Sequence, residues 1–115
     1  MSRRELAEWL ADKLNVPVAP SPLDPVVAPG LVLGPGNDYR SPLVACGWSR
    51  GVSVEVLGLD MDAIDVHDAL DDLVDATLDA LDVADVDVVG SVPAPAERVV
   101  GDKAHLATTI QARLP

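Results

Sequence analysis

A regular alternation of apolar and acidic positions dominates the second half of the chain. From residue 65 to residue 82, apolar side chains recur at spacings of three and four, and the positions opposite them are mostly Asp. This period predicts an α-helix with one buried face. The expected buried face consists of Val66, Leu70, Leu73, Val74, Thr77, Leu78 and Leu81. The expected exposed face consists of His67, Asp68, Asp71, Asp72, Asp75, Asp79 and Asp82. Because acidic residues at i,i+4 repel and Asp is a poor helix former, the apolar face must stabilise this helix.

A second, shorter helix is predicted at the N-terminus. Ser2 followed by Glu5 three residues later is a capping-box pattern. Its apolar face would consist of Leu6, Trp9, Leu10 and Leu14. Arg3 and Arg4 lie unfavourably against the positive end of the helix dipole. We expect Pro17 to end the helix.

The segment from Pro17 to Pro42 holds seven Pro and three Gly, which excludes another helix there. We expect an edge strand made of Val26-Val27 and Leu31-Val32-Leu33 and interrupted at Pro29. A loop is expected around Asn37, Asp38 and Tyr39. The glycines Gly30, Gly34 and Gly36 loosely resemble a phosphate-binding loop. They are simpler as turn residues, because no Lys-Ser or Lys-Thr pair follows them.

The remaining patterns predict strands. Leu43–Trp48 is expected to form one strand, and Ser49 and Arg50 a turn before the alternating segment Val52–Val56. A hairpin or one long bent strand would give the same pattern. Another strand is expected over Val86–Val89, with Gly90–Pro95 closing it. In the final strand, Ala104, Leu106, Thr108, Ile110 and Ala112 point one way, and His105, Ala107, Thr109, Gln111 and Arg113 point the other.

The order helix, strands, helix, strands predicts an α+β fold in one domain spanning residues 1–115. We expect a mostly antiparallel sheet of four or five strands with both helices on one face.

Composition and charge narrow the classes of partner. The formal net charge is −11, and no Lys or Arg occurs between Gly51 and Glu97. Such a chain is not expected to bind nucleic acid specifically, or an anionic membrane, because both are polyanions. No transmembrane pattern is present. The acidic helix face is either a solvated surface that reflects composition or a dedicated electrostatic surface; the first is the simpler interpretation.

The possible chemical sites each have a simpler structural explanation. Cys46 could pair with His67 or His105, but no Gly-flanked nucleophile turn surrounds it, so a buried small hydrophobe is expected. Both histidines are expected to be solvated. Asp60, Asp62 and Asp65 have a spacing that invites comparison with a calcium loop. That loop needs Gly at its sixth position and Glu at its twelfth, where this chain has Asp65 and Asp71. Helix capping by Asp62 or Asp65 is the better explanation. No catalytic, cofactor or metal site is predicted.

The chain resembles the small tail-terminator, or tail-completion, proteins of long-tailed bacteriophages. The resemblance lies in the short N-terminal helix, the Pro-rich stretch Asp24–Gly30, and the alternating strand Gly51–Leu57 that leads through Asp60 into the long helix. The closing pair, Val86–Val92 and Gly101–Ile110, is similar to the family's final hairpin. One departure is the segment Gly34–Pro42, where aromatic packing is expected and only Tyr39 is present. The richness in Ala, Val, Asp, Gly and Pro is typical of a GC-rich genome and points to an actinobacterial phage.

The resemblance implies a non-enzymatic virion protein at the head–tail junction, assembled in the host cytoplasm. Such proteins form rings, commonly of six subunits, that cap the tail tube and dock it to the head connector or stopper protein. The contacts are then expected at Val26, Val27, Tyr39, Trp48, Gln111 and Arg113. The acidic face could line the channel or point outward. Two alternatives remain open: another neck component such as a head-completion protein, and an acidic regulatory module that mimics nucleic acid.

Overall fold

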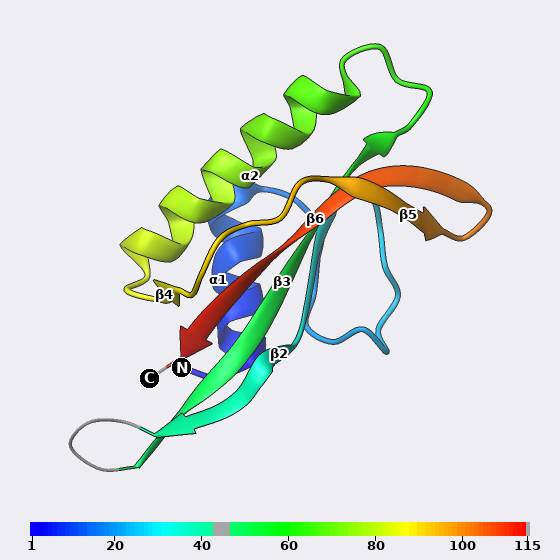
Figure 1. The fold of residues 1–115 in the computed structure, drawn as a ribbon. Coiled ribbons are helices and arrows are strands. Elements are labelled where there is room, and N and C mark those ends of the chain that lie inside the picture. The colour runs from blue at the N-terminus through cyan, green and yellow to red at the C-terminus, as the bar shows by residue number, and fades with distance from the viewer. Residues whose placement is uncertain (43–46, 115) are drawn as a thin grey trace.

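The computed structural model describes residues 1–42 and 47–114. Two helices and six strands follow one another along the chain (Figure 1). In order they are α1 (Arg3–Leu14), β1 (Val18–Ala19), β2 (Gly30–Pro42), β3 (Trp48–Asp60), α2 (Val66–Val83), β4 (Asp87–Val88), β5 (Ala96–Val100) and β6 (Lys103–Leu114). The predicted α+β class is confirmed. The sheet has six strands instead of four or five, and it is mixed, because β1 runs parallel to β2.

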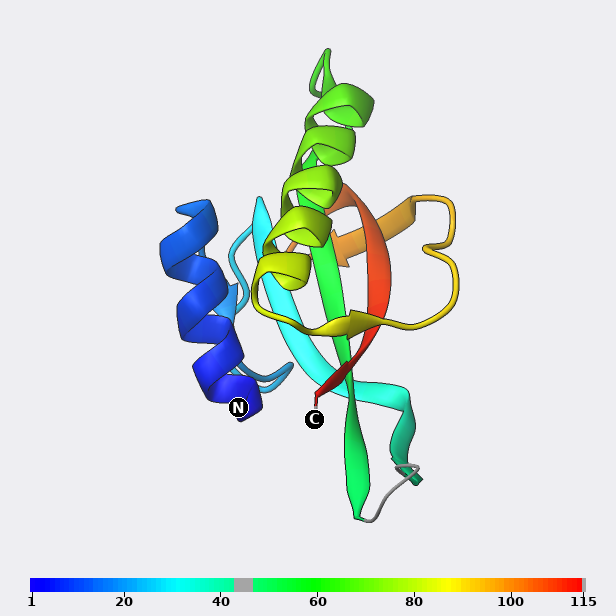
Figure 2. The ribbon, with the colours of Figure 1, turned by 90° about the vertical axis from the view of Figure 1, so that its left-hand side faces the viewer.

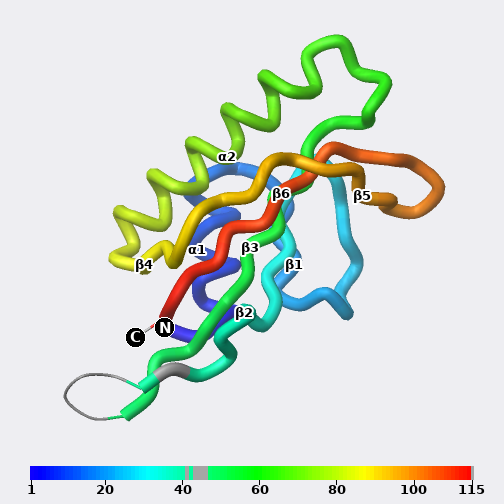
Figure 3. The backbone as a smooth tube through the Cα atoms, viewed as in Figure 1, coloured from blue at the N-terminus to red at the C-terminus, as the bar shows by residue number. Residues whose placement is uncertain are grey.

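The sheet is built around three long antiparallel strands. The strand order is β1-β2-β3-β6-β4, and β5 also pairs with β6. β5 borders β6 near its start, where Ala96 pairs with Ala107, and β4 borders it near its end, where Asp87 pairs with Arg113. Figure 3 shows the same backbone as a tube through the Cα atoms.

Both helices pack on the same face of the sheet (Figure 2), as predicted. α1 lies beside β1 and β2, and α2 lies across β3 and β6. The predicted buried face of α2 is confirmed: Val66, Leu70, Thr77 and Leu81 are buried, and its other members are half-buried. These side chains join a core made mainly of Leu and Val from the facing strands.

The N-terminal helix has the predicted capping box. The Glu5 backbone N–H donates to Ser2 Oγ at 3.1 Å, and the Ser2 backbone N–H donates to Glu5 Oε1 at 3.2 Å. The helix ends at Leu14, ahead of Pro17, because Asn15 takes the left-handed conformation with φ 54°. An Asn in that conformation commonly ends a helix.

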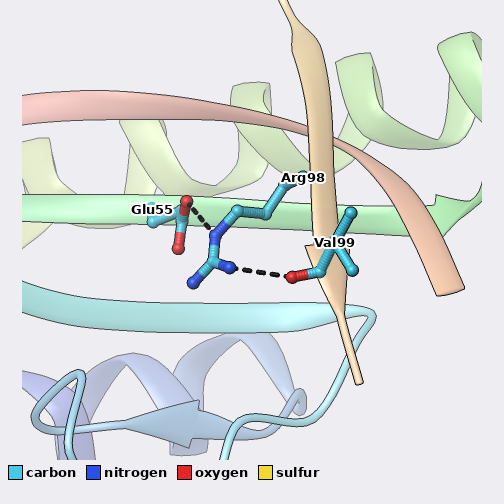
Figure 4. Close-up of polar contacts among 3 residues, drawn as sticks. All are labelled: Glu55, Arg98 and Val99. Atoms are coloured by element: carbon cyan, nitrogen blue, oxygen red, sulfur yellow. Dashed lines mark hydrogen bonds and ion pairs between the residues drawn. The ribbon is translucent and has the colours of Figure 1, made fainter. Parts of the chain in front are cut away.

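The opposite face of the sheet carries a second, smaller apolar cluster of Ala19, Val32, Leu57 and Ala107. The loop residues Val26 and Ala28 and the β5 residue Val100 pack against it. The β5–β6 hairpin crosses this face (Figure 4), and the Arg98 Nε donates to Glu55 Oε2 on β3 at 3.1 Å. The Arg98 Nη1 also donates to the Val99 carbonyl at 2.8 Å.

One prediction about a histidine was wrong. His105 was expected to be solvated, but it is buried, and its Nδ1 lies 3.1 Å from the Gly58 carbonyl oxygen. Gly58 lies where the pairing of β3 with β6 shifts between Leu57 and Asp60. The imidazole therefore satisfies a carbonyl at an irregular point in the ladder. His67, on the outer face of α2, is exposed as predicted.

Several strand predictions were wrong in the first half of the sheet. Val26-Val27 lies in a loop, and the Leu31–Val32 part of β2 is flanked by β1 and β3, so it is not an edge. Asn37–Tyr39 belongs to β2, where a loop was expected. Ser49 and Arg50 lie inside β3, where a turn was expected. A strand was expected over residues 43–48. Residues 43–46, which include Cys46, lie outside the described residues, and Trp48 begins β3.

The closing hairpin was also misplaced. The segment around Val86 gives only the two-residue strand β4, and the true hairpin joins β5 to β6 through a turn in which Gly101 has φ 66°. β5 was missed because its residues are almost all exposed and carry no apolar alternation.

Candidate assembly surfaces

The β2–β3 ribbon forms an arm that extends past the rest of the sheet (Figure 1). β6 ends beside it, because Leu114 pairs with Arg50, while the pairs Ser41–Ser49 and Pro42–Trp48 continue with no third strand from the described residues alongside. The arm contributes to an elongated outline of 49 × 25 × 24 Å. No helix packs against this part of the ribbon in the views of Figures 1 and 2.

Two of the three aromatic side chains lie exposed on β2 and β3. Trp48 at the start of β3 is 63% exposed, and Tyr39 of β2 is 56% exposed. Trp9, the third, is half-buried against the core. In a chain without Phe, two of the three aromatic side chains are therefore more than half exposed.

An irregular segment of β2 lies at the base of the arm. Pro35 pairs with Val52 and Arg40 with Arg50, so extra residues of β2 bulge out between these pairs. The bulge lies so close to β3 that a Cβ at Gly51 would collide with the Asp38 carbonyl oxygen. The Asn37 backbone N–H donates to Gln111 Oε1 at 3.1 Å, which ties the bulge to β6.

The structure places the remaining predicted contact residues in different settings. Gln111 is half-buried and bonded to Asn37, and Arg113 is half-buried beside the same bulge. Val26 packs against the second apolar cluster, whereas Val27 is 56% exposed. Val27 thus lies apart from Tyr39 and Trp48, which belong to the two strands of one ribbon.

A concave surface rich in Arg lies beside the base of the arm. Arg3 and Arg4 of α1, Arg40 of β2 and Arg50 of β3 line a hollow of about 370 Å³ together with Tyr39. We call these four side chains the arginine hollow. They are four of the six Arg in the chain. The strand register brings two of them together, because Arg40 pairs with Arg50.

The charges of the arginine hollow are only weakly compensated. The Arg50 Nη2 donates to the Met1 carbonyl at 2.7 Å, and the Arg40 Nη1 donates to the Tyr39 carbonyl at 2.9 Å. The Arg40 guanidinium also lies 4.1 Å from the centroid of the Tyr39 ring. In the described part of the chain the ion pairs are Arg98–Glu55 and Lys103–Asp60, and neither involves the hollow.

Arg50 of the hollow acts on the carboxylate of Glu5. Hydrogen bonds from the backbone and side chain of Ser2 are the main reason that the pKa of Glu5 is lowered, and the N-terminal amine and Arg50 add smaller effects. Glu5 bonds Ser2 in the capping box, and in the described residues no carboxylate forms an ion pair with the four Arg of the hollow.

The acidic face of α2 is exposed as predicted. Asp68, Asp71, Asp72, Asp75, Asp79 and Asp82 all face solvent. Within residues 1–42 and 47–114 none of them forms an ion pair. The last turn of α2 carries no basic residue.

Capping by Asp62 or Asp65 was a wrong prediction. Asp65 occupies the N-cap position of α2 but makes no side-chain capping bond. Asp62 instead donates its backbone N–H to Asp60 Oδ1 at 2.9 Å, and Lys103 Nζ lies 3.6 Å from Asp60 Oδ2. The Asp62 hydrogen bond, aided by Lys103, lowers the pKa of Asp60. Asp60 therefore stabilises the turn that precedes the helix.

The described residues offer few features of a chemical site. Among them, no three His, Cys, Asp or Glu side chains converge as metal ligands do. Over the same residues, every buried side-chain nitrogen or oxygen has a hydrogen-bond partner. No helix in the described part is both long and apolar enough to cross a membrane.

The chain was compared with protein-family models, curated proteins and solved structures, and none of them matches it.

The arginine hollow is the feature that sequence reasoning missed. Arg3 and Arg4 were visible as residues poorly suited to a helix start, but Arg40 and Arg50 lie far from them in sequence. Only the pairing of β2 with β3 reveals that these side chains surround one hollow.

Proposed function

We propose that this protein is a structural subunit that assembles with further copies of itself, as a tail-terminator protein of a long-tailed phage does. In that role it would form a ring, of about six subunits by its resemblance to that family, on the end of the tail tube and dock to the head connector. The observation that carries the proposal is the arm, with Trp48 and Tyr39 exposed on a ribbon whose end pairs with no third strand of the described residues. Aromatic residues are enriched at the cores of protein interfaces.

Energetic reasoning supports a partner for the arm. An isolated two-stranded ribbon is marginally stable in water. Unpaired strand edges also invite pairing with other chains. A ring or a tube that covers the arm would bury Trp48 and supply the packing that the ribbon lacks.

The acidic face fits the same role. A ring at the head–tail junction must let DNA pass, and those carboxylates that no neighbouring copy covers would repel a polyanion. The proposal holds whether these Asp residues line the channel or face outward, and it includes no catalytic step, cofactor or metal.

The decisive experiment is genetic. Deleting the gene from its phage should leave filled heads and separate tails of irregular or excessive length in electron micrographs. Heads that lose their DNA would instead indicate a head-completion protein. Normal joined virions would refute the proposal.

Complementation of the deletion tests the arm itself. Trp48→Ala and Tyr39→Ala should fold, because both side chains are exposed, but should restore few infectious particles. Ile64→Ala is the matched control, since Ile64 is fully exposed in the connection that follows β3, at the other end of that strand. If all three variants complement equally, the aromatic side chains of the arm are not needed for assembly.

One observation favours a second function. Six exposed Asp on one helix face, without ion pairs in the described part of the chain, could occupy the nucleic-acid site of a basic protein. The neighbouring genes distinguish the two proposals. Capsid, connector and tail-tube genes support the terminator, whereas a nuclease, polymerase or toxin gene supports the mimic.

A further inference from the structure

The cations and anions of this protein are separated in space. Four Arg surround the arginine hollow, whereas the acidic face of α2 has no cation in its last turn and no ion pair among the described residues. Arg98 and Lys103, by contrast, are each paired with a carboxylate of their own molecule. Within residues 1–42 and 47–114, therefore, neither charged surface forms an ion pair.

We propose that the arginine hollow of one copy binds the acidic face of α2 of the next copy. This inference rests on the proposed function and specifies the contact through which the subunits would join. The shapes agree, because the hollow is concave and the outer face of a helix is convex. Arg also suits the contact, since its planar guanidinium binds carboxylates through two parallel hydrogen bonds.

The arrangement predicts a head-to-tail assembly. The hollow lies at the N-terminal end of α1 and beside the arm, whereas the acidic face follows the length of α2. Figure 2 shows α1 and α2 as separate helices. Because the two surfaces are different parts of the molecule, each copy can bind one neighbour through its arginine hollow and another through its acidic face. Such contacts continue from copy to copy and give a ring when the rotation closes.

The net charge of −11 opposes this association, so the ionic strength decides which effect prevails. At about 0.15 M salt the Debye length is about 8 Å, which is short beside the smallest molecular dimension of 24 Å. Repulsion between whole copies is then largely screened, while ion pairs in direct contact are screened less. Self-association is expected near 0.15 M salt and should weaken toward about 1 M, where the Debye length is about 3 Å.

A charge-swap experiment tests the contact. One variant, Arg3→Glu/Arg4→Glu, reverses part of the hollow, and Glu in the first turn suits the helix dipole. The other, Asp75→Lys/Asp79→Lys, reverses part of the acidic face at exposed positions. Sedimentation velocity and native mass spectrometry at about 0.15 M salt would measure the assembly.

Each variant alone should associate at least about tenfold more weakly than the wild type, because two attractive pairs become repulsive. An equimolar mixture of the two variants should assemble again, because each reversed surface then meets a complementary one. The controls carry the same changes in net charge elsewhere: Lys13→Glu/Lys103→Glu and Asp12→Lys/Asp102→Lys. Both controls should assemble better than the variants that they match.

Three outcomes would overturn the inference. The first is a wild-type chain that stays monomeric at high concentration. That result would not refute the proposed function, because a ring can also form only on the tail tube. The gene deletion tests the proposed function separately. The second is a mixture that assembles no better than its components. The third is tight binding of a short DNA duplex that Arg3→Glu/Arg4→Glu abolishes, which would assign the hollow to nucleic acid.

Discussion

Leu70→Ala tests the claim that the apolar face alone holds α2 in place. Leu70 is fully buried, and its Cδ1 lies 3.3 Å from the position that a Cβ would occupy at Gly58. Its side chain therefore fills the space that the glycine leaves open above β3. Removing most of that side chain leaves a cavity against the backbone of a strand.

The expected loss of unfolding free energy is about 3–5 kcal/mol. Fully buried Leu→Ala substitutions cost about 2–5 kcal/mol, and the cost rises where the site cannot collapse. Here collapse is hindered, because the Gly58 carbonyl is bonded to His105 and the pairs Leu57–Ala107 and Asp60–His105 hold β3 on either side of Gly58. Leu73→Ala and Leu78→Ala should cost less, since both side chains are only half-buried.

Asp75→Ala is the control on the opposite face of the same helix. Asp75 is exposed among like charges, so its removal should change the free energy of unfolding by less than about 0.5 kcal/mol, or raise it. Urea unfolding followed by far-ultraviolet circular dichroism separates the two results. With a slope of about 2 kcal/mol per M, Leu70→Ala should lower the midpoint by about 1.5–2.5 M. A loss under about 1 kcal/mol for Leu70→Ala, or an equal loss for Asp75→Ala, would refute the reasoning.

Further predictions concern the bulge, the turn before α2 and the acidic face. Gly51→Ala should cost about 1–3 kcal/mol, because its Cβ would collide with the Asp38 carbonyl, and faster hydrogen exchange at Asn37 would report the displaced bulge. The pKa of Asp60 is lowered in the folded protein, so its stabilisation is full above the unfolded pKa and is lost as pH falls through the folded one. Asp60→Asn should therefore flatten the fall in stability that urea melts show below about pH 4; an unchanged profile would contradict this. Salt between about 10 mM and 0.15 M should raise the free energy of unfolding by screening the Asp residues of α2, and calorimetry should show no saturable calcium binding.

The sequence predicted the elements whose pattern is local. α2 and its two faces follow from apolar spacing, and the start of α1 follows from the reciprocal bonds of Ser2 and Glu5. In both cases a few neighbouring residues determine the structure.

Features that depend on strand pairing could not be predicted in this way. The segment around Asn37 resembles a loop in sequence, yet β3 and Gln111 hold it as a bulge within β2. His105 alternates with apolar neighbours as a solvated residue would, but it is buried and its Nδ1 bonds the Gly58 carbonyl. In each case one hydrogen-bond partner lies more than 40 positions away in the chain: Gln111 for Asn37, and Gly58 for His105.

The arm and the arginine hollow belong to one continuous surface. Tyr39 lines the hollow and lies on the same ribbon as Trp48, and Arg40 and Arg50 pair across that ribbon. Charged side chains at the edge of a ribbon discourage indiscriminate pairing, while a partner of opposite charge can still approach. A copy that docks its acidic helix into the hollow would then lie beside the aromatic side chains and shield them from water.

Trp48 fluorescence, read in a Trp9→Phe background, should therefore become protected from acrylamide quenching when the two charge-swapped variants are mixed. If assembly is restored but Trp48 stays accessible to acrylamide, the arm does not take part in the contact between copies and remains a candidate surface for the tail tube.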